Sequence, residues 1–253
     1  MRISCHYVLG VLCLIPGARS LAQSSADLQP SLQRVDMIPL PAGYERVIVA
    51  PGSFAEYLRQ LPLRKDNTVY LYNGQPKKDQ SLHYAVIDIS TGKKDLQQCA
   101  DLVMRLRAEY FYSKKMYDSI VFASANTPYR FRDYCRVASR ECLMHFMEQV
   151  FLNCGTYSLE KQLRKTVMGD MRIGDVFIKG GAPGHAEIVI DMAINKQTGD
   201  KLFMLAEGYM PAQDAHIVRN PLAASAGPWY GPTEPGKLVT ATWVFETTQL
   251  KTW

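Results

Sequence analysis

The sequence lacks the patterns that mark several large classes of protein. Its 253 residues carry a formal net charge of only +5 and no dense run of lysine and arginine, so nothing indicates nucleic-acid binding. No His-Glu-x-x-His, glycine-rich phosphate loop or Gly-x-Ser-x-Gly motif occurs, and we expect neither a metal nor a cofactor. Aromatic residues make up 10% of the chain, and apolar runs recur regularly, which excludes a disordered or collagen-like protein.

The first 22 residues have the features of a secretory signal peptide. Arg2 supplies a positive start, an apolar stretch covers 7–16, and Ser20 and Ala22 are the small residues that a signal peptidase reads. The apolar stretch is too short to span a bilayer as a helix, although a membrane anchor is the alternative. We therefore expect a periplasmic or secreted protein with no transmembrane segment after cleavage. Cleavage lowers the formal charge to +3 and leaves four cysteines: Cys99, Cys135, Cys142 and Cys154.

The remaining chain is predicted to form one α+β domain. Residues 23–44 are polar and interrupted by prolines, which predicts a linker before a single domain over 45–253. Because helical patterns come first and alternating strands follow, we expect N-terminal helices packed on a mostly antiparallel sheet. Apolar spacing predicts helices over 54–61, 96–112, 138–153 and 159–165. Short β-rich runs predict strands over 46–50, 68–72, 83–88, 119–123, 175–178, 186–191, 202–206 and 239–245, with a hairpin turn over 195–200.

Cys99 is the candidate nucleophile. It lies near the start of the helix predicted over 96–112, where the positive end of the helix dipole favours a thiolate. A thiolate is the attacking group of cysteine hydrolases. Cys99 also lies on the apolar stripe of this helix, so a buried structural cysteine is the alternative.

His185 and Glu207 are the candidate base and orienting group. His185 begins a strand after Gly184, which can let another backbone approach, and it could take a proton from a thiol across a cleft. If 195–200 forms a hairpin, the next strand lies beside it, and Glu207 could reach the imidazole and fix its tautomer. A surface histidine and a solvated edge carboxylate are the alternatives.

Three further residues are candidates for ligand binding. Trp229 lies in a loop rich in glycine and proline, where an exposed ring can stack on a sugar, although the ring could instead pin the loop to the core. Tyr209 and Gln213 follow the strand that ends at Glu207.

The other cysteines are assigned structural roles. Cys135 and Cys142 are seven positions apart and could form a disulfide in an oxidising compartment. Cys154 follows an apolar helix and is expected to be buried rather than reactive.

The order of these features resembles the NlpC type of papain-like cell-wall peptidases. A cysteine at a helix start, Gly-Asp-Val at 174–176, Gly-His at 184–185 and a polar residue on the next strand carry the resemblance over about 95–210. It implies a papain-like fold and a secreted hydrolase of peptidoglycan stems or an envelope glycopeptide. Cys99 would be the nucleophile, His185 the base and Glu207 the orienting group. Such peptidases usually have Asp-Cys-Ser-Gly, whereas this chain has Gln-Cys-Ala-Asp over 98–101.

A closer resemblance covers nearly all of the mature chain. The segments 70–74, 95–110, 184–191 and 209–213 resemble an uncharacterised bacterial envelope family, a domain of unknown function (DUF 4846). This resemblance implies secretion and a fold but no reaction, and family members usually have glutamine in place of Glu207. Two hypotheses follow: a cysteine hydrolase, and a non-catalytic envelope protein that keeps the fold and uses its cleft for binding.

Overall fold

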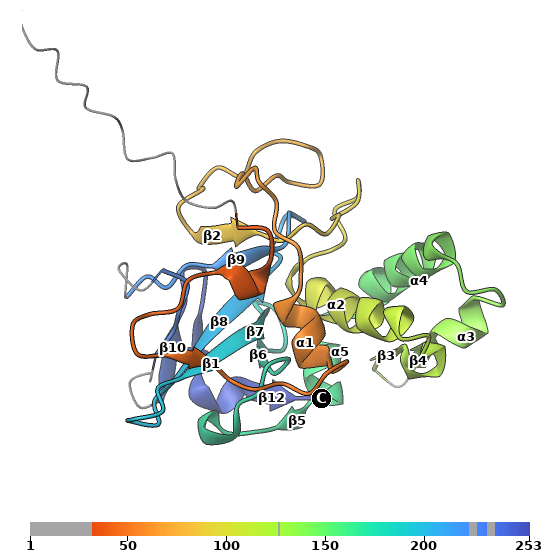
Figure 1. Cartoon of the computed structure of the whole chain (residues 1–253). Coiled ribbons are helices and arrows are strands. Elements are labelled where there is room, and N and C mark those ends of the chain that lie inside the picture. The colour runs from red at the N-terminus through yellow and green to blue at the C-terminus, as the bar shows by residue number, and fades with distance from the viewer. Residues whose placement is uncertain (1–31, 126, 223–226, 232–235) are drawn as a thin grey trace, which may run out of the picture. The chain divides into compact units, whose positions relative to one another are not determined.

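The β-rich runs of the chain pair into one antiparallel sheet (Figure 1). The computed structural model describes residues 32–125, 127–222, 227–231 and 236–253, so the predicted signal peptide lies outside the described residues. The strands follow the order β2–β9–β8–β7–β6–β12–β5, and β1 pairs with β7 beside this path. The strands of this sheet are β1 (Glu45–Arg46), β2 (His83–Val86), β5 (Arg164–Lys165), β6 (Val176–Lys179), β7 (His185–Ile194), β8 (Lys201–Glu207), β9 (His216–Val218) and β12 (Leu250–Thr252).

The long hairpin of β7 and β8 forms the centre of the sheet. Asn195 donates its amide to the carbonyl oxygen of Asp200 at 2.9 Å, which closes the turn predicted over 195–200. Nine of the ten residues of β7 are buried, because the strand has neighbours on both edges and α1 and α2 pack against it. A shift in register between Val189 and Asp191 interrupts the pairing with β8. The Asp191 carboxylate forms ion pairs with Arg46 and Arg59.

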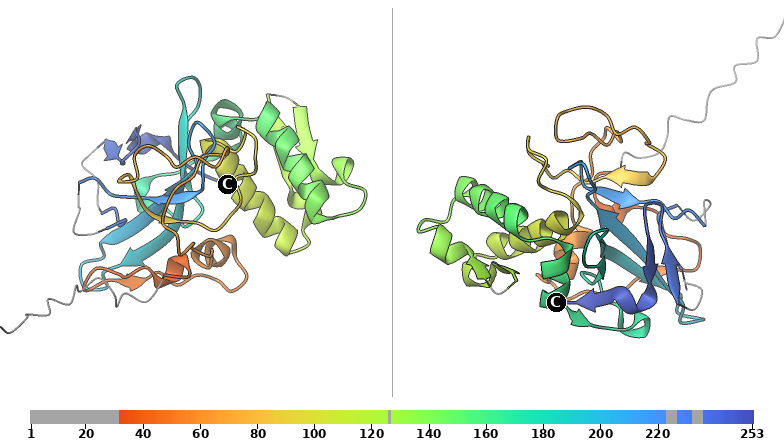
Figure 2. Two further views of the ribbon diagram at one scale, coloured as in Figure 1. Left: turned by 90° about the horizontal axis from the view of Figure 1, so that it is seen from above. Right: turned by 180° about the vertical axis from the view of Figure 1, so that it is seen from behind.

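The helices are few, and most follow β2 in the chain. They are α1 (Phe54–Arg59), α2 (Cys99–Ser113), α3 (Phe131–Tyr134), α4 (Arg140–Asn153) and α5 (Thr156–Gln162). The expected set of N-terminal helices is therefore replaced by one short helix, because the chain before Cys99 is mostly extended and irregular. α4 lies beside α2 on the side away from the sheet (Figure 2), and Ser139 caps it by accepting the amide of Cys142 at 3.1 Å.

Three predicted strands differ in the structure. Of the strand predicted over 46–50, only Arg46 lies in a strand, β1. The segment 68–72 makes only isolated bridges, Tyr70 with Pro76 and Leu71 with Gln213. The single strand predicted over 239–245 is two short strands, β10 (Lys237–Val239) and β11 (Val244–Glu246), joined by a tight turn. A similar two-stranded sheet pairs β3 (Val121–Ser124) with β4 (Thr127–Arg130). Alternating apolar residues predict extended chain over 68–72 and 239–245, but only tertiary contacts decide the pairing.

The end of the predicted linker is packed against the domain. Val35 and Ile38 are buried, and the carbonyl oxygen of Pro39 accepts a hydrogen bond from the indole of Trp229 at 2.8 Å. Residues from about 34 onward therefore belong to the folded unit. Among the described residues, no helix combines the length and the apolar character needed to cross a membrane.

Candidate active site

Cys99 is the first residue of α2, a few positions later than the predicted helix start. The carboxylate of Asp101 accepts the amide of Gln98 at 3.0 Å and closes the helix N-terminus. Asp95 accepts the amide of Ala212 at 2.7 Å, which ties the approach to the helix to the chain beyond β8. Cys99 is a free thiol and only partly buried. Its amide and the next one lie in the first helical turn, where no acceptor exists within the helix.

The β7–β8 pairing places His185 beside two carboxylates. Ile188 pairs with Ala206, so Glu187 and Glu207 occupy the next position on the two strands. His185 Nε2 lies 2.6 Å from Glu207 Oε2 and 3.5 Å from Glu187 Oε1. Cys99 is the third side chain that acts on this imidazole, and it contributes to raising the pKa of His185. Because Glu207 occupies Nε2, Nδ1 is the nitrogen that remains for a bond to the thiol.

Glu207 has two further partners. Thr242 Oγ1 donates to Oε2 at 2.8 Å, and His216 Nε2 lies 3.1 Å from Oε1. His216 comes from β9, whose pairing with β8 places it directly opposite Glu207. His216 Nδ1 lies 2.8 Å from the carbonyl oxygen of Asp214, which can only accept, so Nδ1 carries a proton.

The electrostatics of this buried cluster separate the two carboxyl groups. Burial opposes ionisation of Glu207, but its hydrogen bonds to His185 and His216 prevail and hold its pKa below its ordinary value. Burial and the neighbouring Glu207 charge raise the pKa of Glu187, although bonds to His185 and Thr240 act against this. Ionised Glu207 can only accept, so Nε2 of both histidines donates to it.

His185 is stabilised in its charged form. Burial lowers the pKa of this imidazole, but its hydrogen bonds to Cys99, Glu187 and Glu207 outweigh burial and raise the pKa above its ordinary value. An imidazolium at this position can donate from Nε2 to Glu207 and from Nδ1 to a thiolate. This arrangement of thiol, imidazole and carboxylate is suited to nucleophilic catalysis.

The same cluster offers atoms that could hold a metal ion. Ligand atoms of His185, Glu187 and Glu207 lie within 4.8 Å of one another, and all three residues are buried. A bound zinc ion needs ligand distances near 2.0–2.2 Å, roughly, to nitrogen and oxygen. It would therefore have to replace the direct 2.6 Å hydrogen bond between His185 and Glu207.

A cavity of about 680 Å³ opens onto Cys99 and His185. Tyr209 and Trp243 also line it, and their ring centroids lie 5.2 and 5.3 Å from that of His185. Its acidic lining residues are Asp95 and Asp101 among the described residues. The thiol and the imidazole are therefore accessible to a molecule in the cavity, whereas Glu207 is shielded behind them.

Two glycines permit the close approach of these segments. A Cβ at Gly208 would lie 2.9 Å from the carbonyl oxygen of Gln98, so glycine lets the end of β8 contact the start of α2. A Cβ at Gly184 would lie 2.8 Å from the carbonyl oxygen of Lys179. The close backbone approach predicted beside His185 is therefore present.

Comparison with protein families identifies the chain. The family model described as Domain of unknown function (4846) matches residues 35–136 and 124–252. The chain belongs to this family. Neither a curated protein nor a solved structure matches it, so no activity can be transferred from a relative. The matched segments contain all three members of the Cys99–His185–Glu207 arrangement.

The candidate ligand-binding residues of this family member lie in different places. Tyr209 lines the cavity of Cys99. Gln213 does not line that cavity. It is 2% exposed, and its backbone forms an isolated β-bridge with Leu71. Trp229 is 1% exposed, so the expectation of an exposed loop ring is wrong. Its indole bonds to Pro39 and its loop is fastened to the core.

Several residues of the site were not found from the sequence: Glu187 as a partner of His185, His216, Thr240, Thr242 and Trp243. The segment His-Ile-Val over 216–218 is a short strand-forming run and could have indicated β9. No local pattern distinguishes the two threonines, because a turn between β10 and β11 brings them to the site.

The remaining cysteines have structural environments. Cys135 and Cys142 form a disulfide with their Cα atoms 6.0 Å apart, the pairing that the sequence left open. Cys154 is buried, and burial together with the nearby Asp101 raises the pKa of its thiol to about 11. Cys154 is thus a poor nucleophile at neutral pH.

Proposed function

We propose that this protein is a papain-like cysteine hydrolase of the NlpC type that cleaves an amide bond in a cell-envelope peptide such as a peptidoglycan stem. One observation carries the proposal. A free thiol at the first residue of α2 shares the lining of an open cavity with an imidazole whose Nε2 lies 2.6 Å from a buried carboxylate. Each group has the partner that its role requires.

In the proposed reaction, Cys99 Sγ attacks the carbonyl carbon of the amide. His185 holds the thiol proton and transfers it to the leaving amine, which leaves an acyl group on sulfur. Water then attacks the acyl carbon while His185 takes its proton, and the acid product leaves as the thiol is restored. The free amides at the start of α2 are placed to stabilise the oxyanion.

Glu207 and His216 act as positioning residues in this scheme. Glu207 fixes the ring orientation of His185 and stabilises the imidazolium that forms during attack. His216 and Thr242 bind Glu207 and keep it aligned although it is fully buried. Burial and the Glu207 charge raise the pKa of the adjacent Glu187, which disfavours a second negative charge beside it.

The envelope assignment rests on separate support. The disulfide between Cys135 and Cys142 is a feature of proteins in oxidising compartments. The N-terminal 22 residues have the pattern of a secretory signal. The cavity combines the acidic Asp95 with the rings of Tyr209 and Trp243, which suits a peptide that carries an amino group.

Digestion of purified peptidoglycan tests the proposal. The full chain should release peptide fragments detectable by mass spectrometry, and Cys99→Ala and His185→Ala should abolish release. A Cys154→Ser variant is the matched control, because Cys154 lies outside the proposed reaction. Release that persists in Cys99→Ala, or that requires added zinc and stops with a chelator, would contradict the thiol mechanism. Binding without release by the wild-type chain would favour the non-catalytic alternative.

A further inference from the structure

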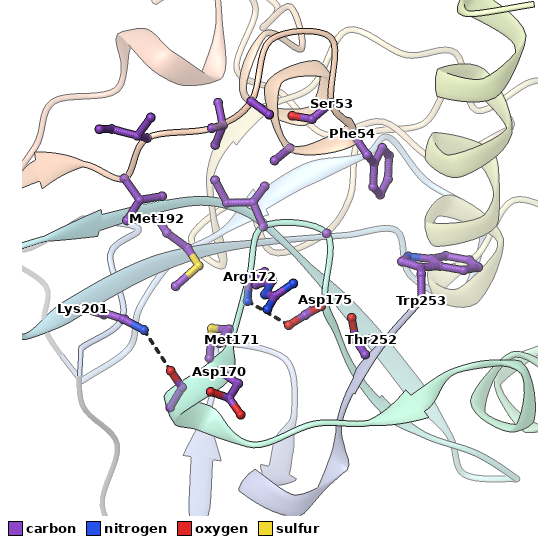
Figure 3. A pocket seen from close by; sticks show the side chains of 18 of the residues that line it. Ser53, Phe54, Asp170, Met171, Arg172, Asp175, Met192, Lys201, Thr252 and Trp253 are labelled. Carbon is purple, nitrogen blue, oxygen red and sulfur yellow. Dashed lines mark hydrogen bonds between the residues drawn. The ribbon is translucent and has the colours of Figure 1, made fainter.

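A second cavity, of about 760 Å³, shares no lining residue with the cavity of Cys99. It lies between the chain that follows β1, the start of α1, the loop over 169–175 and the end of β12 (Figure 3). In Figure 3, Phe54 and Trp253 lie at one side of the cavity and Met192 at the other, with Arg172 and Asp175 between them. Apolar side chains and charged groups therefore line the same space.

Arg107 is the unusual residue of this cavity. It belongs to α2, and its guanidinium carbon lies 4.8 Å from the ring centroid of Phe54, 4.5 Å from that of Phe111 and 4.9 Å from that of Trp253. Its Nε is buried without a hydrogen-bond partner, and no carboxylate acts on the guanidinium among the described residues. Arg107 as a whole is only partly buried. Cation–π contacts offset part of its desolvation, and an anionic partner would offset more of it.

The other charges of the cavity do not supply that partner. Arg172 and Lys201 add two cations, and the Lys201 ammonium is bonded only to the carbonyl oxygen of Gly169, at 2.9 Å. Asp175 is 3% exposed, and burial raises the pKa of its carboxyl group above the ordinary value. Asp170 is exposed, as are Arg172 and Lys201, so the lining has three basic and two acidic side chains, an excess of one positive charge.

The apolar part of the lining indicates what an anion bound here would carry. Val47, Val49, Phe54, Ile173 and Met192 line the cavity around the guanidinium groups. A bare inorganic anion would leave these side chains uncovered, whereas an apolar chain would bury them and gain free energy from doing so. A guanidinium can bind a carboxylate through two parallel hydrogen bonds.

We propose that this cavity binds a small amphipathic carboxylate, with its head group at Arg107 and Arg172 and its apolar chain against Phe54 and Met192. Arg107 lies eight residues beyond Cys99 on the same helix, about 12 Å along its axis. The site is thus separate from the thiol and independent of the proposed hydrolase reaction.

Calorimetric titration of the full chain with decanoate, below its micelle concentration, tests this site. The neutral analogue decanol and the short anion acetate are the comparison probes. Decanoate should bind at least about tenfold more tightly than either, because only it satisfies both the guanidinium groups and the apolar lining. Arg107→Gln should weaken decanoate binding by about 10- to 100-fold, the range for loss of a hydrogen bond to a charged group.

Two variants keep the test interpretable. Arg172→Gln changes an exposed side chain of the cavity, so it should preserve the fold and weaken decanoate binding in the same direction. Arg130→Gln changes an exposed arginine of β4 outside the cavity and should leave binding unchanged. Equal affinity for decanoate and decanol, equal affinity for acetate, no binding at all, or unchanged affinity in both cavity variants would overturn the proposal.

Discussion

Replacing Glu207 by glutamine should slow the reaction of Cys99 with a small electrophile. Glu207 accepts a hydrogen bond from His185 at 2.6 Å and is 0% exposed, so water cannot replace it. A hydrogen bond to a charged group contributes about 1.5–3 kcal/mol. One pKa unit corresponds to about 1.4 kcal/mol, so the pKa of His185 should fall by about 1–2 units. The imidazolium–thiolate pair should become about 10- to 100-fold less populated.

Alkylation by iodoacetamide at pH 6, followed by intact mass, measures this effect. In the chain without residues 1–22, which lacks Cys5 and Cys13, the disulfide removes Cys135 and Cys142 from the reaction and Cys154 is buried, so a single modification reports on Cys99. Glu246→Gln, which changes an exposed residue of β11, is the matched control and should react at the wild-type rate. Thermal unfolding of each variant separates lost reactivity from a lost fold.

Two outcomes would refute the reasoning. If Glu207→Gln is folded and is alkylated at the wild-type rate, the buried carboxylate does not stabilise His185. If wild-type Cys99 reacts at pH 6 no faster than a free cysteine, no thiolate–imidazolium pair exists and the proposed nucleophile is wrong. A His216→Asn variant keeps a side-chain donor for the carbonyl oxygen of Asp214, and it should slow alkylation less than Glu207→Gln because Thr242 still binds Glu207.

Two other substitutions test the surroundings of Cys99. Burial raises the pKa of Asp101 from 3.8 to about 8, so the folded state retains a proton that the unfolded state releases, and stability should fall as the pH rises between these values. Asp101→Asn should flatten this dependence by up to about 4 kcal/mol between pH 5 and pH 8 in denaturant unfolding; parallel curves for the two proteins would show that the carboxyl group is not responsible. Gly208→Ala should push the end of β8 away from the carbonyl oxygen of Gln98. The alkylation rate of Cys99 should then fall about tenfold or more, a larger effect than the few tenths of a kcal/mol that a surface substitution ordinarily has on stability. An unchanged rate would mean that the contact does not align the site.

The proposed hydrolase site and the proposed carboxylate site lie on the same helix. Cys99 begins α2, and Arg107 lies two turns further along, among three aromatic rings. Each site has its own probe, iodoacetamide for the thiol and decanoate for the guanidinium. Failure of one proposal therefore leaves the other to be judged by its own measurement.

Local sequence patterns by themselves determined much of the secondary structure. The 3.6-residue spacing of Leu143, Phe146, Met147 and Val150 predicted α4, and all four are buried. Alternation and turn residues predicted the β7–β8 hairpin and its closure over 195–200. Residue chemistry also selected Cys99, His185 and Glu207, because a helix-start thiol and a histidine after glycine are recognisable along the chain.

Only the tertiary structure decided which distant groups contact these three. His216 reaches Glu207 through the pairing of β8 and β9, and Thr242 reaches it from the turn that divides the strand predicted over 239–245. Trp229 shows the same limit, because a ring in a glycine- and proline-rich loop has no local feature that fixes whether it faces solvent or Pro39. Helix and strand periodicities are properties of neighbouring residues, whereas register, burial and hydrogen-bond partners depend on the packing of separate segments, here 9, 35 and 190 positions apart.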